Sequence, residues 1–153
     1  MASTSPALCR SRVVRLRKTA GANAGSGFGA AKGAGVYATG TVTLNGTAIT
    51  NNTADSDRGR AEGGGLWTSG STLEMTNTDV TGNTASGTES GTSLGTRGGG
   101  LAVTSGTTTI TGGAISNNTA TVDTSGTHEV FGGGLFAGGD LEMTGTAVSG
   151  NTA

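Results

Sequence analysis

The sequence repeats itself four times, and this repetition restricts the possible fold more than any other feature. Each unit opens with a glycine cluster and closes with Asn-Thr-Ala. The units span residues 33–54, 63–85, 98–120 and 132–153, with lengths of 22, 23, 23 and 22 residues. Polar inserts of different length separate them. A constant unit with a variable insert is typical of a solenoid, in which coils stack on one another while loops leave at a corner.

The composition of the units favours strands. Gly, Thr and Asn dominate them, whereas an amphipathic helix needs strong helix formers with a 3.6-residue apolar period. The β-branched Thr, Val and Ile suit strands instead. Only 32% of the chain is hydrophobic and 31 residues are Gly, so a compact globule would lack core material. We therefore predict three short strands per coil, near residues 35–38, 41–45 and 47–51 in the first unit.

Alignment of the units places similar side chains in columns. The predicted core contains Val36, Leu66, Leu101 and Leu135; Leu44, Met75, Ile110 and Met143; and Ile49, Val80, Ile115 and Val148. A further column of Val42, Leu73, Thr108 and Leu141 stands two residues before the Leu44 column, as expected for a strand with one buried face. The position between these two columns holds Thr43, Glu74, Thr109 and Glu142, which we expect to face solvent.

A polar column closes each unit. Asn52, Asn83, Asn118 and Asn151 occupy it. We predict an amide ladder in which each side chain bonds to the coils above and below and satisfies backbone groups at the turn. The neighbouring glycines would provide tight corners and positive φ angles.

These features predict a right-handed parallel β-helix of about four coils over residues 33–153, forming part of a longer solenoid. Residues 1–32 hold six of the nine cations and no acid, and we expect a disordered or processed basic leader.

The remainder carries three arginines and all ten acids, a net charge of −7, which argues against nucleic-acid binding. No segment is apolar enough to span a membrane. The uncapped last coil predicts end-to-end self-association.

The repeat resembles right-handed β-helix proteins of the pectin-lyase-like superfamily. GGGLW at 63–67, GGGLF at 132–136 and the TGNTA and SGNTA endings are similar to the coils of surface proteins and adhesins. Gly112-Gly113-Ala114-Ile115 looks like the GGAI repeat of polymorphic outer-membrane proteins, without their FxxN motif. The resemblance covers residues 33–153 and implies a cell-surface or extracellular location.

No catalytic constellation is visible in the sequence. Glu74 and Glu142 share an outward column two coils apart, about 10 Å at the usual strand spacing, but nothing marks either one for burial. His128 is the only histidine, and with Asp123 and Glu129 it makes a poor metal site. We predict no metal and no cofactor.

One column has a candidate binding role. Tyr37, Trp67 and Phe136 share it with Ala102, and strand alternation turns them away from the core. Exposed stacked aromatics would bind sugar rings or a partner protein, whereas insert loops folding over them would make them ordinary hydrophobic cover.

The sequence therefore predicts a non-enzymatic structural or adhesive module that binds carbohydrate or a cell-surface protein. The alternative is an inactive or truncated piece of a polysaccharide lyase or glycoside hydrolase of the same superfamily.

Overall fold

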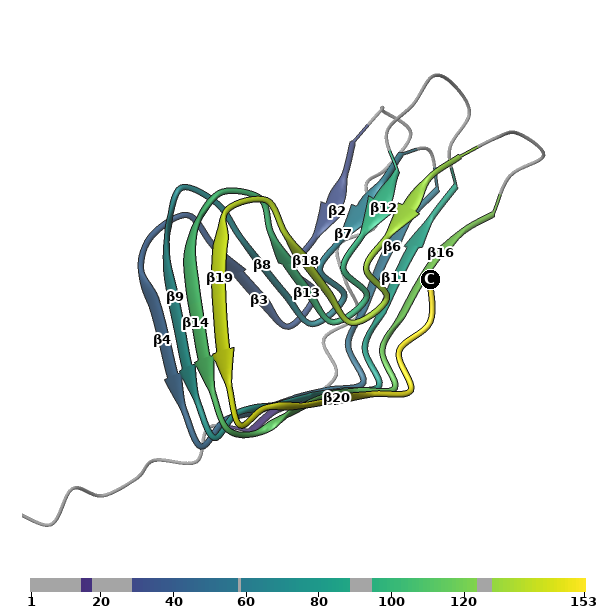
Figure 1. Cartoon of the computed structure of the whole chain (residues 1–153). Coiled ribbons are helices and arrows are strands. Elements are labelled where there is room, and N and C mark those ends of the chain that lie inside the picture. Colours follow the sequence, from purple (N-terminus) through teal and green to yellow (C-terminus); the bar gives the residue numbers. More distant parts are fainter. Residues whose placement is uncertain (1–14, 18–28, 58, 89–94, 124–127) are drawn as a thin grey trace, which may run out of the picture.

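The protein is a parallel β-solenoid in which successive coils lie side by side (Figure 1). The computed structural model describes residues 15–17, 29–57, 59–88, 95–123 and 128–153. Every regular element in these ranges is a strand, and all strand pairs are parallel. The predicted all-β solenoid class is confirmed.

Three of the five sheets correspond to the three predicted strands of each unit. Sheet D contains β3 (Val36–Ala38), β8 (Leu66–Thr68), β13 (Leu101–Val103) and β18 (Leu135–Ala137). Sheet E contains β4 (Val42–Asn45), β9 (Ser71–Thr76), β14 (Gly106–Thr111) and β19 (Asp140–Thr144). Sheet A contains β5 (Ala48–Thr50), β10 (Asp79–Thr81), β15 (Ala114–Ser116) and β20 (Ala147–Ser149).

The other two sheets include residues that the sequence assigned to polar inserts. Sheet B contains β6 (Thr53–Ser56), β11 (Thr84–Gly87) and β16 (Thr119–Val122). Sheet C contains β2 (Ala31–Lys32), β7 (Ala61–Glu62), β12 (Thr96–Arg97) and β17 (Val130–Phe131). A full coil therefore has five strands, because the two ends of each insert continue the ladder.

The chain returns to sheet C three times after β2, which makes about three turns and slightly fewer than the four coils predicted. The last turn contains β17 to β20 but contributes no strand to sheet B. Only an isolated bridge between Thr119 and Thr152 continues that sheet. The last turn is thus incomplete at the position that β6, β11 and β16 occupy in the earlier coils.

Part of the predicted leader belongs to the solenoid. β1 (Arg15–Arg17) pairs with β5 and forms one edge of sheet A, with Leu16 beside Ile49. β2 begins at Ala31, two residues before the predicted boundary at residue 33. Residues 1–14 and 18–28 lie outside the described residues, so the expectation of disorder there stays a prediction.

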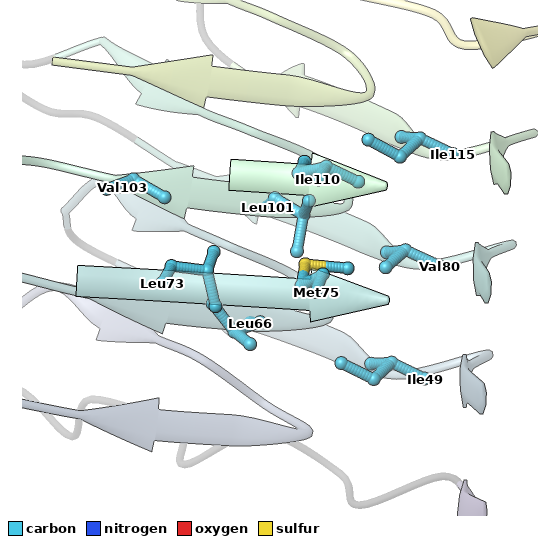
Figure 2. Close-up of a cluster of buried hydrophobic side chains, with 9 residues drawn as sticks. All are labelled: Ile49, Leu66, Leu73, Met75, Val80, Leu101, Val103, Ile110 and Ile115. Carbon is cyan, nitrogen blue, oxygen red and sulfur yellow. The ribbon is translucent and has the colours of Figure 1, made fainter. Parts of the chain in front are cut away.

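The apolar columns meet inside the coil as like on like. Register pairs Val36 with Leu66, Leu66 with Leu101, and Leu101 with Leu135. Figure 2 shows Ile49, Val80 and Ile115 one above another on successive strands. The middle coils are fully enclosed, whereas Val36, Leu44, Leu135 and Met143 are partly buried against the same cluster. Val148, included in the predicted core, is instead 58% exposed because it lies on the edge strand β20.

The asparagine column forms a continuous hydrogen-bonded ladder. The amide Nδ2 of Asn52 donates to Oδ1 of Asn83 at 2.9 Å, and the same bond recurs from Asn83 to Asn118 and from Asn118 to Asn151 at 3.0 Å. Oδ1 of Asn83 also accepts the backbone N–H of Asn52, and the same bond recurs at the next two steps of the ladder. Nδ2 of Asn83 additionally donates to the carbonyl of Ile49. The ladder thereby satisfies backbone groups at a buried corner, where an unpaired group is costly.

The glycine clusters form the sharp corner between sheets C and D. Gly63 has φ of 64°, a conformation that side-chain-bearing residues seldom adopt. A Cβ atom on Gly64 would lie 2.3 Å from the carbonyl oxygens of Gly99 and Thr84. The corner therefore requires glycine for its backbone angle at one position and for lack of space at the next.

Sheets B and C pack together through very small side chains. Ala31, Ala54, Ala61 and Ala85 form a second buried cluster, separate from the main core. Figure 1 shows the strands of the two sheets running side by side as a projection beside the main coil. Sheet C turns away from sheet D at the glycine corner, so the outer surface of sheet C faces the outer surface of sheet D. This arrangement positions the candidate site.

Candidate binding site at the outer corner

The predicted aromatic column lies on sheet D and faces outward at the glycine corner. Tyr37 pairs in register with Trp67, Trp67 with Ala102, and Ala102 with Phe136. The residue that directly precedes each first glycine forms the opposing column on sheet C. We call these two columns, together with Arg60, the outer corner; the opposing column comprises Lys32, Glu62, Arg97 and Phe131.

Tyr37 and Trp67 form a stacked pair. Their ring centroids are 4.7 Å apart and their planes differ by 9°. Tyr37 is 59% exposed, whereas Trp67 is 5% exposed beneath it. The indole Nε1 of Trp67 donates to Oε2 of Glu62 at 3.2 Å, and Lys32 Nζ lies 4.3 Å from the indole centroid. Trp67 is therefore fixed by a hydrogen bond and a cation–π contact, and it supports the exposed tyrosine ring.

Phe136 and Phe131 form a second aromatic group two coils away. Their centroids are 6.2 Å apart, with a tilt of 57°. The guanidinium carbon of Arg97 lies 4.9 Å from the Phe136 centroid and 5.8 Å from that of Phe131. Ala102, between Trp67 and Phe136, is fully buried. Side chains thus cover the middle of the outer corner and leave Tyr37 and Phe131 as its most exposed rings.

Glu62 is a buried carboxylate surrounded by three cations. Its side chain has no exposed surface. Oε2 lies 3.6 Å from Lys32 Nζ, and Oε1 lies 3.4 Å from Arg60 Nε and 3.6 Å from the Arg97 guanidinium. The three cationic side chains are 24–28% exposed. The cluster therefore carries two more positive charges than negative ones.

The sequence predicted the aromatic column and its outward direction, but it did not identify the charged column opposite. The signal was present, because Lys32, Glu62 and Arg97 each directly precede an aligned glycine. It was missed because Lys32 was assigned to the basic leader, and Glu62 and Arg97 to the ends of polar inserts. The structure also separates the predicted contact residues: Tyr37 is open to solvent, Phe136 is half-buried, and Trp67 is covered.

The outward column on sheet E has a different character. Glu74 and Glu142 each pair with Thr109 from opposite sides, so they lie two coils apart. Both side chains are exposed.

Among the described residues, no group of three or more His, Cys, Asp or Glu side chains is placed to hold a metal ion. No helix within the described ranges is long and apolar enough to cross a membrane.

Comparison with known proteins finds no matching family model and no significant match among curated proteins or solved structures. The likeness to pectin-lyase-like coils therefore stays a prediction from the sequence. The parallel solenoid itself rests on the strand pairing described above.

Proposed function

We propose that this solenoid is a non-catalytic binding module of a cell-surface or extracellular protein, and that its outer corner binds carbohydrate. The observation that carries the proposal is the exposed Tyr37 ring stacked on the fixed Trp67 ring. A sugar ring combines apolar C–H faces with hydroxyl edges. A flat aromatic face beside polar donors matches both, because the ring covers the apolar face while the donors bond to the hydroxyls.

The rigidity of the stacked pair supports the same function. A binding residue that is already ordered loses little conformational entropy when its ligand arrives. Tyr37 sits on a strand of the solenoid, and Trp67 beneath it is held by Glu62 and Lys32. The outer corner is therefore preorganised, as a binding surface on a rigid scaffold should be.

The test follows the fluorescence of Trp67 during titration with oligosaccharides, in parallel with a glycan array. Trp67 is the only tryptophan of the chain, so its emission reports on the outer corner alone. We expect Tyr37→Ala to weaken binding at least about tenfold, which corresponds to roughly 1.4 kcal/mol. Tyr37→Phe should retain most of the affinity because it keeps the ring.

The matched control is Thr43→Ala, an exposed change on sheet E away from the outer corner. It should leave binding unchanged. Urea unfolding of each variant would separate lost binding from lost structure. If Tyr37→Ala bound the same glycans with wild-type affinity, the proposed site would be wrong.

A further inference from the structure

The outer corner concentrates the cations of a chain segment that is otherwise acidic. From residue 29 onward the sequence has four cations and ten acids. Three of those cations, Lys32, Arg60 and Arg97, lie within 3.6 Å of the single carboxylate of Glu62. One cation would neutralise it. Two more held at the same place repel each other, so the arrangement is electrostatically unfavourable unless another anion joins it.

The cations also retain hydrogen-bond donors. A guanidinium has five N–H donors in a planar fork that suits a carboxylate or a sulfate. The contacts of Arg60 and Arg97 with Glu62 are 3.4 and 3.6 Å long, which is longer than a good charge-assisted hydrogen bond. The Nε of Arg97 is buried and has no hydrogen-bond partner among the described residues. The side chains of Arg60 and Arg97 are both partly exposed, so a ligand from solvent can reach them.

From this charge balance we infer that the outer corner binds an anionic saccharide, one whose sugar ring carries a carboxylate or a sulfate group. This inference rests on the proposed carbohydrate function and specifies its ligand class. The sugar ring stacks on Tyr37, and the anionic group is held by Lys32, Arg60 and Arg97. Glu62 acts as a positioning residue, because its buried carboxylate gathers the three cations and accepts the hydrogen bond that fixes Trp67.

The aromatic rings favour a saccharide over an acidic peptide. Lys32 lies over Trp67 and Arg97 lies beside Phe136, so each of these cations is next to a ring. A ligand that reaches the cations therefore lies along the aromatic column as well. A compact sugar ring that bears an acid group contacts the cations and the aromatic column at once. A carboxylate on a flexible peptide side chain contacts only the cations.

The experiment compares three probes at equal concentration of anionic groups: a hyaluronan hexasaccharide, its sulfated derivative, and poly-glutamate. The carboxyl-methylated hexasaccharide provides the neutral form of the same backbone. We expect at least tenfold tighter binding to one of the acidic saccharides than to the neutral form or to poly-glutamate. Binding should weaken several-fold between 50 and 500 mM NaCl, because the exposed part of the attraction is screened.

The test variant is Arg97→Gln, which should lose at least about tenfold in affinity for the acidic saccharide. Its control is Thr43→Glu, which lowers the net charge of the protein by the same single unit on sheet E and should have a much smaller effect. Lys32→Gln provides a second variant in case Arg97→Gln reduces stability, which urea unfolding would reveal. Rescue by Arg97→Lys would be partial, because lysine keeps the charge but lacks the planar fork.

The outcomes separate the two levels of the proposal. Equal, Tyr37-dependent binding of neutral and acidic saccharides would overturn the charge inference and leave the carbohydrate function standing. Equal binding of poly-glutamate and acidic saccharides would show general attraction of anions and overturn the inference. If the Thr43→Glu control lost as much affinity as Arg97→Gln, the location at the outer corner would be wrong. Absence of binding to every probe would overturn the charge inference, and absence of binding across the glycan array would reject the carbohydrate function as well.

Discussion

At the scale of single residues, the solenoid depends on a few buried polar side chains with fixed partners. Asn52, Asn83, Asn118 and Glu62 are fully buried. Asn83 and Asn118 each bond to the coils on both sides, and Glu62 accepts a hydrogen bond from Trp67 and contacts three cations. Such groups are strongly stabilising in place, and their removal leaves buried partners unsatisfied. A buried polar group without a hydrogen-bond partner destabilises the fold instead. This chain contains buried polar groups of both kinds.

Asn83→Ala should destabilise the protein by about 3 kcal/mol, because each buried polar group left unpaired costs about 1–3 kcal/mol. The substitution removes the acceptor of two bonds from Asn52 and the donor to Ile49 and Asn118. Urea unfolding, monitored by circular dichroism, would measure this loss of stability. Asn51→Gly is the control: Asn51 is exposed with φ of 56°, so glycine should be tolerated. Equal stability of Asn83→Ala and wild type would refute the ladder's role.

Thr108→Val should stabilise the protein by about 1 kcal/mol, within the range for removing an unsatisfied buried hydroxyl. Thr108 is fully buried in a column with Leu73 and Leu141, and its Oγ1 has no hydrogen-bond partner among the described residues. Valine has nearly the same shape. Thr107→Val, on the exposed side of the same strand, should change stability by less than about 0.5 kcal/mol. A lower urea midpoint for Thr108→Val would contradict this account.

At the scale of elements, the corners decide where each sheet begins. The corner between sheets C and D turns the chain so sharply that backbone atoms of neighbouring coils occupy the space of a side chain. That turn also places Lys32, Glu62 and Arg97 opposite the aromatic column. The glycine cluster thus shapes the outer corner, the proposed binding site, although no glycine needs to touch a ligand.

Gly64→Ala should be severely destabilising, by more than about 3 kcal/mol, because its methyl group would overlap two carbonyl oxygens that belong to the backbone. Thermal and urea unfolding would measure the loss. Gly40→Ala is the matched control, since a Cβ there meets no atom within 4 Å and the backbone angle is ordinary. If both alanines were equally tolerated, the close approach of coils at the corner would be incorrect.

At the scale of the whole molecule, stability arises from coil-on-coil contacts that repeat along the stack. Each strand pairs with strands of the coils beside it, so neighbouring coils provide the main tertiary contacts. A solenoid of this kind behaves nearly as a one-dimensional series of similar units. Removing one whole unit should therefore shorten the molecule without changing its fold.

Deletion of residues 63–97 should leave a folded, shorter solenoid. The deletion joins Glu62 directly to Gly98. Glu62 then occupies the position before the glycine corner that Arg97 has in the intact chain, because these two residues are equivalent in register. We expect the same β-type circular dichroism per residue and a urea m-value lower by roughly a quarter, because m scales with the surface exposed on unfolding. Deletion of residues 63–80 breaks the register and should unfold the chain. A folded product from the second deletion alone would contradict in-register stacking.

The repeat itself determined the solenoid, the strands of sheets A, D and E, and the vertical alignment of Leu66, Leu101 and Leu135. These follow from the sequence because stacking in register pairs each residue with its aligned counterpart, so a column in the alignment becomes a column in space. The same logic predicted the outward direction of Tyr37 and Phe136. It could not predict that Trp67 is covered, since burial depends on side chains from another sheet.

Only the tertiary structure decided how the inserts fold and what they bring to the aromatic column. The two-residue strands of sheet C are too short to show a period, and the alanines between sheets B and C give no strong apolar pattern. Their packing depends on the close approach of two backbones, which sequence spacing does not reveal. That approach converts Lys32, Arg60 and Arg97, far apart in the chain, into one cationic cluster around Glu62.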